Sequence, residues 1–147
     1  MGTDIEMFAE KRDGFGWKPC FPLRRNKFGN PCMTEVYRND RNYALFRILA
    51  NVGRLTNQGI GPVFPPRGLP DDLSPELATL ADFIADYDSH NYSWLLLREL
   101  LEFPWYEEKH GGRILADHCN YFESRTIPLL QRYGDPDDVR IVFWFWS

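Results

Sequence analysis

Side chains that bind phosphate and sugar groups occur close together in the segment PPRGLPDD, residues 65–72. The guanidinium group of Arg67 can hold a phosphate or carboxylate through two parallel hydrogen bonds. The prolines and Gly68 indicate an ordered but irregular loop, and binding groups favour loops on a rigid scaffold. We expect this loop to line a pocket, with Arg67 contacting an anionic group and Asp71 or Asp72 fixing the loop or accepting hydrogen bonds from a sugar or base.

A second candidate for anion binding is the segment RNYALF, which begins at Arg41. Asn42 can cap a helix here, and the N–H groups of a helix N-terminus attract anions. Arg41 would add a cation, and Tyr43 would add an aromatic ring on which a base could stack. The open alternative is an ordinary helix cap with no ligand.

The third candidate segment contains His90, Ser93 and Trp94. Ser93 is predicted to cap a helix with the sequence WLLLRELLEF, and Trp94 would offer another stacking surface. Together with the helix starts expected at Asn42 and Ser74, this segment gives three helix N-termini that could converge on one phosphate-bearing ligand. Ordinary, unrelated caps remain the alternative.

A metal-dependent alternative uses Asp4, Glu6, Asp88 and His90. Asp4 and Glu6 lie two residues apart on a predicted strand, so they share one face and can present paired carboxylates to a divalent metal. With Asp88 and His90 they would form a cluster suited to phosphoester hydrolysis, although nothing in the sequence brings the two segments together. Glu6 could instead pair with a cross-strand cation such as Arg140, or face solvent.

The sequence contains none of the motifs GxSxG, GxxxxGK[ST] and GxGxxG. These motifs mark the hydrolase nucleophile elbow, the P-loop and the dinucleotide-binding turn. We therefore lean towards a protein that is not an enzyme, and we expect no cofactor and no bound metal.

Cysteine usage and hydropathy bear on localisation. The three cysteines are an odd number and form no CxxC pair, which is typical of a reduced protein. The N-terminus lacks the pattern of a secretory signal, and no apolar stretch is long enough to span a membrane. We expect a cytoplasmic protein without membrane association.

Charge is distributed unevenly along the chain. The formal net charge is −4, but residues 1–68 carry a net charge of +5 and residues 69–147 a net charge of −9. An overall negative charge argues against binding to a nucleic acid duplex. The first half can still contain a local anion site, and a solvated basic face is the alternative.

The first secondary-structure element expected to position the candidate site residues is a strand. Residues 3–11 alternate between polar and apolar side chains, and residues 15–21 can return as the second strand of a hairpin. A helix capped by Asp40 or Asn42 and ended by Gly53 is predicted next. Its apolar stripe consists of Leu45, Ile48, Leu49 and Val52.

Later segments predict more helix and a final strand. Ser74 supplies an N-cap for a second helix, followed by Pro75 at the first helical position. Residues 112–133 form a fourth helical region that Pro128 should kink or split. Residues 138–146 are β-branched and aromatic on both faces, which favours a central strand. The buried stripe of the second helix consists of Leu77, Leu80, Ala81 and Ile84.

The order strand, strand, helices, strand is typical of an α+β fold. We expect a small, mostly antiparallel sheet made of the N-terminal hairpin and the C-terminal strand, packed with about four helices. The length of 147 residues predicts a single domain, residues 1–147.

Five segments together resemble a family of phage and prophage proteins that typically begin Met-Gly-Cys-Asp-Ile-His. They occur in the family's order and are MGTDIEMFAEKRDGFGW, DRNYALFRILANV, PRGLPDDLSPE, SHNYSWLLLREL and VRIVFWFW. The resemblance implies a small, phage-encoded protein in the cytoplasm of a bacterial host, and it implies no settled activity. Thr3 and Glu6 replace the family's cysteine and histidine, which weakens the metal-hydrolase hypothesis.

These observations favour a phage-type binding protein that sequesters a small anionic, nucleotide-like ligand, such as a bacterial immune signalling nucleotide. A metal-dependent phosphoesterase acting on a nucleotide is the first alternative. A phage inhibitor that docks on a host protein, through the aromatic last strand or the segment PLRRNKFG, is the second. A homodimer is a further expectation, because a small chain encloses a nucleotide more easily together with a partner.

Overall fold

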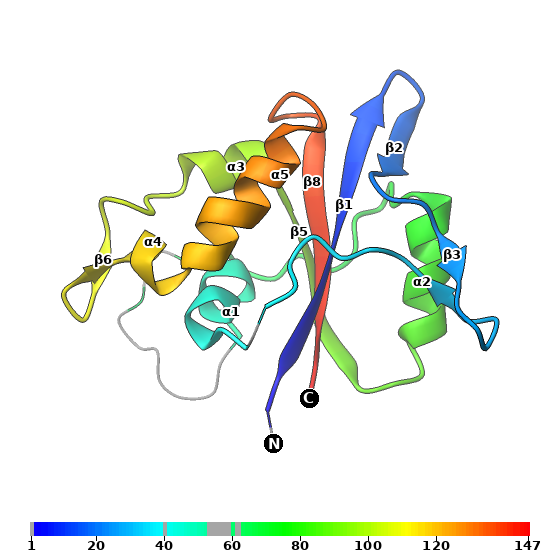
Figure 1. Ribbon diagram of the computed structural model, residues 1–147, viewed down its shortest axis with the longest axis horizontal. Coiled ribbons are helices and arrows are strands. Elements are labelled where there is room, and N and C mark those ends of the chain that lie inside the picture. The colour runs from blue at the N-terminus through cyan, green and yellow to red at the C-terminus, as the bar shows by residue number, and fades with distance from the viewer. Residues whose placement is uncertain (1, 40, 53–59, 61–62) are drawn as a thin grey trace.

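A computed structural model of the chain describes residues 2–39, 41–52, 60 and 63–147. Its centre is a four-stranded antiparallel sheet with the strand order β2-β1-β8-β5. The four strands are β1 (Asp4–Asp13), β2 (Gly16–Pro19), β5 (Ser89–Leu96) and β8 (Val139–Trp146). Figure 1 shows this sheet with most of the helices on one side and helix α2 (Pro75–Ile84) on the other. The predicted α+β class, with an antiparallel sheet that joins the N-terminal hairpin to the C-terminal strand, is confirmed.

The last strand is central, as its composition predicts. β8 pairs with β1 on one side and with β5 on the other, and its residues 139–145 are all buried. A strand covered on both faces needs apolar residues in consecutive positions, which accounts for the run of β-branched and aromatic side chains. Arg140 interrupts this run and lies on β8 directly opposite Glu10 of β1.

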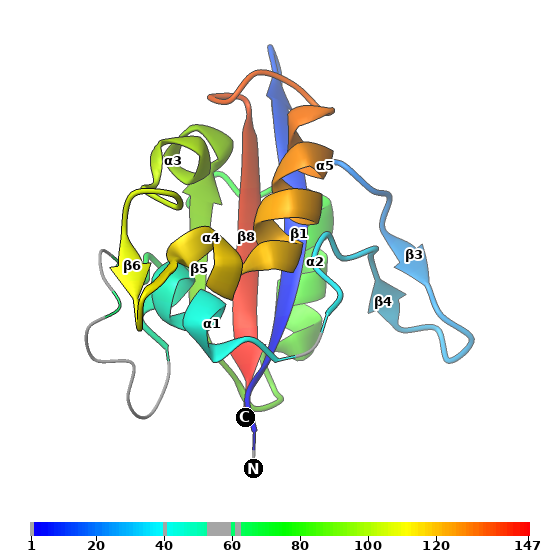
Figure 2. The same cartoon turned by 60° about the vertical axis from the view of Figure 1, so that its left-hand side comes forward.

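Most helices cover one face of the sheet, as Figures 1 and 2 show. They are α1 (Tyr43–Ala50), α3 (Leu97–Glu102), α4 (Leu115–His118), the π-helical segment η1 (Phe122–Thr126) and α5 (Ile127–Gln131). Their apolar side chains pack against inward-facing residues of the three long strands to form the larger core. None of the helices in the described part of the chain is long and apolar enough to cross a membrane.

The opposite face carries helix α2 (Pro75–Ile84) and a small hairpin of β3 (Arg24–Arg25) and β4 (Pro31–Cys32). A second two-stranded hairpin, β6 (Lys109–His110) with β7 (Arg113–Ile114), precedes α4. The smaller core under α2 consists of Phe8, Met33, Leu77, Leu80, Ala81, Ile84, Val142 and Trp144.

Two helices follow their sequence signals. Asn42 caps α1 through its side chain, and Ser74 caps α2 in the same way, with Pro75 in the first turn. The predicted stripe of α2 is buried, and three of the four predicted stripe residues of α1 are fully buried. Helix α1 ends at a left-handed Asn51, while the alternative cap Asp40 and the predicted stop Gly53 lie outside the described residues.

The prediction that Ser93 caps a third helix is wrong. Ser93 lies inside β5, and the helix begins only at Leu97. Residues 94–97 form an unbroken apolar run, because Leu95 and Leu97 pack in the larger core while Trp94 packs against the smaller one. Such a run cannot be distinguished from a buried helix by periodicity. The fourth helical region is divided into α4, η1 and α5, and Pro128 is the second residue of α5, directly after the π-helical segment.

Candidate functional site

The loop that follows Arg67 borders a groove with a volume of about 610 Å³. The groove opens over one end of the sheet, where β2, β8, β5 and this loop meet. Its lining residues are Arg12, Trp17, Arg67, Leu69, Pro70, Asp71, Asp72, Trp94, Leu96 and Arg140. We call this site the arginine–tryptophan groove.

Three arginines and two tryptophans alternate along the groove. The guanidinium carbon of Arg12 lies 5.0 Å from the ring centroid of Trp17, and that of Arg140 lies 4.0 Å from the same ring. Trp94 lies between Arg140, at 5.7 Å, and Arg67, at 4.7 Å. Guanidinium groups stack favourably on aromatic faces, and the large indole ring is the best partner. The result is an ordered stack that joins the first hairpin, β8, β5 and the loop.

Arg140 and Glu10 form the buried floor of the groove. Arg140 is 2% exposed and Glu10 is fully buried, and the Arg140 Nε atom donates to Glu10 Oε1 at 2.7 Å. The other side of the guanidinium donates to Asp72 Oδ1 at 2.8 Å and holds the pKa of that carboxyl below its usual value. A buried ion pair must be saturated with hydrogen bonds to offset its loss of hydration, and Glu10 meets this condition by also accepting from the backbone N–H of Ser74. Asp72 therefore fixes the loop onto the sheet.

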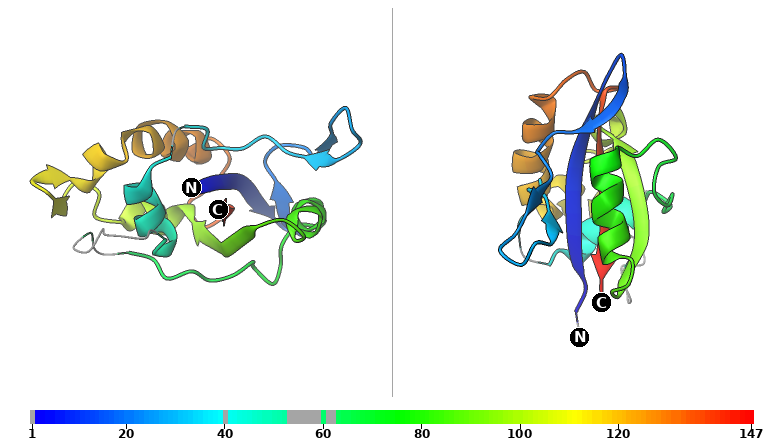
Figure 3. Two further views of the ribbon diagram at one scale, coloured as in Figure 1. Left: turned by 90° about the horizontal axis from the view of Figure 1, so that it is seen from below. Right: turned by 90° about the vertical axis from the view of Figure 1, so that its right-hand side faces the viewer.

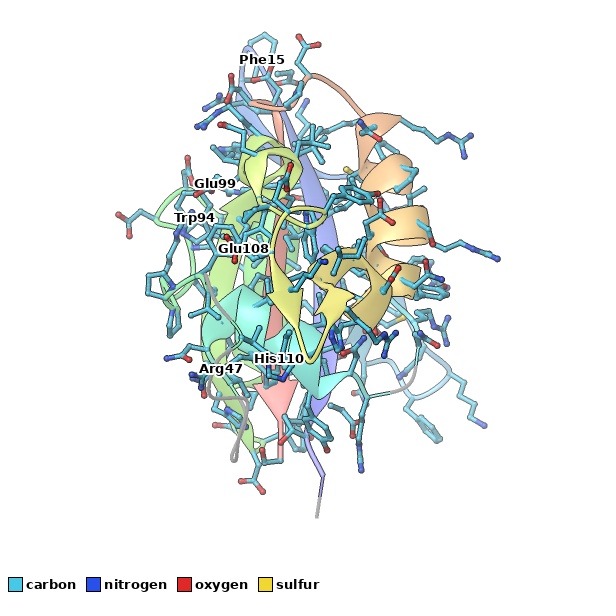
Figure 4. All side chains as sticks on the ribbon, turned by 90° about the vertical axis from the view of Figure 1, so that its left-hand side faces the viewer. Phe15, Arg47, Trp94, Glu99, Glu108 and His110 are labelled. Carbon is cyan, nitrogen blue, oxygen red and sulfur yellow. The ribbon has the colours of Figure 1, made fainter. Side chains whose placement is uncertain are left out.

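Arg67 lines the outer side of the groove. Its backbone N–H donates to Ser93 Oγ at 3.0 Å, and its guanidinium group makes a two-pronged ion pair with Glu99. Burial raises the pKa of Glu99, but hydrogen bonds from Arg67 and from the backbone N–H of Leu96 outweigh burial and hold it below its usual value. Figure 4 shows Trp94 and Glu99 close together on this side of the molecule.

Gly68 allows the loop to turn at the sheet edge. Its φ is +78°, a conformation that residues with a side chain rarely adopt, and its N–H donates to the carbonyl of Tyr92 at 2.8 Å. The loop is thereby hydrogen-bonded to β5 beside Trp94. Of the sequence-predicted binding residues, the structure brings together Arg67, Gly68, Asp71, Asp72, Ser93 and Trp94.

Arg41, Asn42 and Tyr43 lie at the other end of the sheet. Arg41 makes a two-pronged ion pair with Asp4, at 2.8 and 3.1 Å, and Asp4 is at the opposite end of β1 from Arg12. The side chain of Asn42 caps α1 and donates to a backbone carbonyl, while the Tyr43 hydroxyl accepts from a backbone N–H. The expected convergence of three helix N-termini is therefore wrong, because the start of α1 lies far from the groove and Ser93 begins no helix.

His90 also lies outside the groove. Its ring nitrogens hydrogen-bond to Asn91 Oδ1 and Ser147 Oγ, both at 2.6 Å, and its ring stacks on Phe145 at 6.2 Å. β5 contains a bulge between His90 and Ser93, with Asn91 at a φ of +54°. The bulge separates His90 from the half of β5 that carries Trp94.

The structure does not assemble the alternative metal site. Asp4 is held by Arg41, whose hydrogen bond lowers the pKa of Asp4. Glu6 accepts hydrogen bonds from the indole N–H groups of Trp144 and Trp146, and the expected partner Arg140 pairs with Glu10 instead. No group of three His, Cys, Asp or Glu side chains suited to a metal occurs in residues 2–39, 41–52, 60 and 63–147.

A second depression lies beside Glu35, which sequence reasoning missed. It has a volume of about 470 Å³ and is lined by Ile5, Glu35, Tyr37, Arg38 and Asn39. Burial and the nearby carboxylate of Glu6 raise the pKa of Glu35 to about 7. No sequence signal marks Glu35, because both causes arise from tertiary structure.

Arg12, Trp17 and Arg140 are the charged and aromatic groove residues that sequence reasoning missed as site residues. Arg140 carries a signal that could have identified it, since it is the one charged residue in the otherwise apolar stretch VRIVFWFW. A cation in a buried strand requires a buried partner. Arg12 and Trp17 carry no comparable signal, because they flank an ordinary hairpin turn.

In comparisons with known proteins, no family model, no curated protein and no solved structure matches this chain.

Proposed function

We propose that the protein binds a small anionic, nucleotide-like ligand in the arginine–tryptophan groove and holds it without chemical change. The observation that carries this proposal is the alternation of guanidinium groups and indole rings along an open groove, with Arg140 fixed at its floor. Guanidinium groups recognise phosphates, and indole rings stack on bases.

The size and composition of the groove suit such a ligand. A volume of about 610 Å³ lies within the usual range for small-molecule sites, roughly 300–1,000 Å³. Asp71 and Asp72 are exposed on its rim, where they can accept hydrogen bonds from a sugar hydroxyl or an exocyclic amine. A nucleotide has three features that the lining residues can bind: negative charge, a flat ring and hydrogen-bond donors.

An anion that binds Arg67 must compete with Glu99. The guanidinium group of Arg67 is already paired with this carboxylate, so a phosphate gains Arg67 only by displacing Glu99 or by sharing the cation with it. Release of Glu99 costs free energy, and the ligand must offset that cost. We therefore expect the negative charge of Glu99 to oppose binding, although Glu99 lies at the edge of the site.

The lining residues favour retention of the ligand over its cleavage. Among the described residues that line the groove there is no serine, cysteine, histidine or lysine. Its carboxylates are Asp71 and Asp72, and Asp72 is held by Arg140. The resemblance to phage proteins extends the proposal to a biological role, the sequestration of a bacterial immune nucleotide in the cytoplasm of the host.

Calorimetric titration with a panel of linear and cyclic nucleotides tests the proposal. For a nucleotide that binds the wild type, Arg67→Gln should weaken binding by about 10- to 100-fold, since a charge-assisted hydrogen bond is lost. Glu99→Gln should tighten binding, because a glutamine oxygen can still accept from Leu96 but no longer neutralises Arg67.

Arg98→Gln is the matched control for the loss of one guanidinium group. Arg98 neighbours Glu99 in sequence but pairs with Asp137 and Glu102, and it does not line the groove. Its substitution should leave affinity unchanged. Equal affinities of the wild type and Arg67→Gln would show that the groove is not the binding site.

A further inference from the structure

The hairpin β3–β4, residues 24–32, projects from the body of the protein as a small arm, which Figure 2 shows in profile. Its tip is internally fixed. Asn26 Oδ1 accepts from the backbone N–H groups of Phe28 and Asn30, at 2.9 and 3.0 Å, and Gly29 supplies the left-handed conformation that closes the turn. The arm therefore presents its side chains from a formed scaffold.

The arm is basic and carries an exposed aromatic ring at its tip. Arg24, Arg25 and Lys27 are exposed, Phe28 is 75% exposed, and residues 24–32 contain no acid. Within the part of the chain that the structure describes, none of these three cations makes an ion pair. The arginines of the groove, in contrast, are all paired with carboxylates.

Helix α2 and the turn after it have the opposite character. Residues 71–97 contain six acids and no lysine or arginine. Asp82, Asp86 and Asp88 are exposed, and no ion pair involves them among the described residues. Tyr87, which is 56% exposed, lies between the last two. We call these four residues the acidic face of α2.

The arm and α2 lie on the same side of the sheet, as Figures 1 and 3 show. Met33, just after β4, packs in the small core with the buried stripe of α2, which fixes the base of the arm beside the helix. One surface of the molecule thus carries an unpaired basic strip with an exposed aromatic ring next to an unpaired acidic strip with an exposed aromatic ring.

A surface of this kind is self-complementary. We infer that two copies of the chain associate around a two-fold axis, with the basic arm of each copy on the acidic face of α2 of the other. In such an isologous contact each copy supplies both halves of the interaction. Phe28 of one copy then meets Tyr87 of the other, and opposite charges surround both rings. This interface is independent of the groove and of its ligand.

The surface carries both positive and negative charges, which argues against a nucleic acid duplex or an anionic membrane as the partner. A nucleic acid duplex or an anionic membrane that approached the arm would also meet the carboxylates of Asp82, Asp86 and Asp88. A second copy in the inverted orientation brings opposite charges together throughout. Because exposed ion pairs are weak and screened by salt, the dimer should weaken markedly as salt is raised.

Sedimentation equilibrium of purified protein at low and high salt tests the inference. The wild type should form dimers at low salt and dissociate at high salt. Arg24→Glu with Arg25→Glu should give monomers, and so should Asp82→Lys with Asp86→Lys. The matched control is Arg125→Glu with Arg132→Glu, which makes the same change of charge at exposed positions outside the arm and should remain dimeric.

Mixing gives the most specific result. The variant with Arg24→Glu and Arg25→Glu and the variant with Asp82→Lys and Asp86→Lys should each be monomeric alone. When mixed they should form a heterodimer, because the acidic arm of the first then meets the basic helix of the second, and the basic arm of the second meets the acidic helix of the first. A wild type that stays monomeric at low salt and high concentration would overturn the inference. A dimer that survives either reversal, or two variants that fail to associate when mixed, would overturn it as well.

Discussion

Glu35 is held with a pKa of about 7, well above the usual value for a glutamate, because it is half-buried and near the carboxylate of Glu6. The backbone N–H of Met7 and the guanidinium group of Arg38 oppose this shift but do not cancel it. The folded protein therefore binds a proton at Glu35 more tightly than the unfolded chain does. Near neutral pH this single carboxyl makes folding stability depend on proton concentration.

The sign of this dependence follows from linkage. The pKa is raised on folding, so the stabilisation by the proton is fully present below about pH 4.5 and is lost as pH rises to about 7. Glu35→Gln stays neutral and can still accept a hydrogen bond. Relative to this variant, the wild type should lose about 1–2 kcal/mol of unfolding free energy between pH 5 and pH 8.

Urea unfolding of both proteins at pH 5 and pH 8 measures the difference. Glu107→Gln, which removes an exposed carboxylate away from the arm and α2, controls for the loss of one negative charge. If the unfolding free energies of the wild type and Glu35→Gln differ by the same amount at both pH values, the pKa of Glu35 is not raised in the folded protein.

At the scale of elements, helix α2 depends on one buried cap. Ser74 is 1% exposed, and its Oγ atom accepts from the N–H of Leu77 at 3.3 Å. The backbone N–H of Ser74 donates to Glu10 Oε2 at 2.9 Å, so the same residue joins the helix to the floor of the groove. Loss of the Ser74 hydroxyl would leave a helix N–H group without its partner.

Ser74→Ala should therefore lower the free energy of unfolding by about 1–2 kcal/mol, the usual cost of losing a helix N-cap. Thr79→Ala in the same helix is the control, since the Thr79 hydroxyl is exposed and bonds only to a carbonyl within the helix. Its effect should stay below about 0.5 kcal/mol. Equal effects of the two substitutions would contradict the capping role of Ser74.

Elements with strong local signals could be predicted from the sequence. Asn42 and Ser74 mark helix starts, the period-two pattern before Gly14 marks β1, and the aromatic run after Val139 marks the central strand. β5 could not be predicted, because its apolar run from Trp94 resembles a helix when its neighbours in the sheet are unknown. Periodicity alone cannot separate a short buried strand from a buried helix.

At the scale of the whole molecule, the groove is assembled from segments far apart in sequence. Arg67, Asp72 and Trp94 could be selected from the sequence, because a Pro- and Gly-rich loop with charges is a usual place for binding groups. Trp17 could not, since it reaches the groove only through the pairing of β1 with β2. Arg140 stands out as a lone charge in an apolar strand, but only the pairing of β1 with β8 shows that it lies in the groove. The register of the sheet, which sets Glu10 opposite Arg140, is the information that the sequence lacks.

The groove differs from the surface formed by the arm and α2 in whether its charges are paired within the chain. In the groove, each arginine is satisfied by a carboxylate of the same chain, so a ligand must compete for it. On the arm and on α2, the charges are unpaired within the described chain, so a partner meets them without competition. The groove therefore favours a ligand that brings both charge and an aromatic ring, while the arm favours a charged protein surface.

Retention of an intact nucleotide tests most directly whether the groove binds such a ligand without changing it. The purified protein is incubated with a panel of linear and cyclic nucleotides, separated from the excess by gel filtration, and denatured by heat. Mass spectrometry then identifies the small molecules that are released. We predict one nucleotide from the panel, released intact and in proportion to the protein, and lost when Arg67→Gln replaces the wild type. Release of no nucleotide, or release of a cleaved product, would show that the protein does not hold an intact nucleotide in the groove.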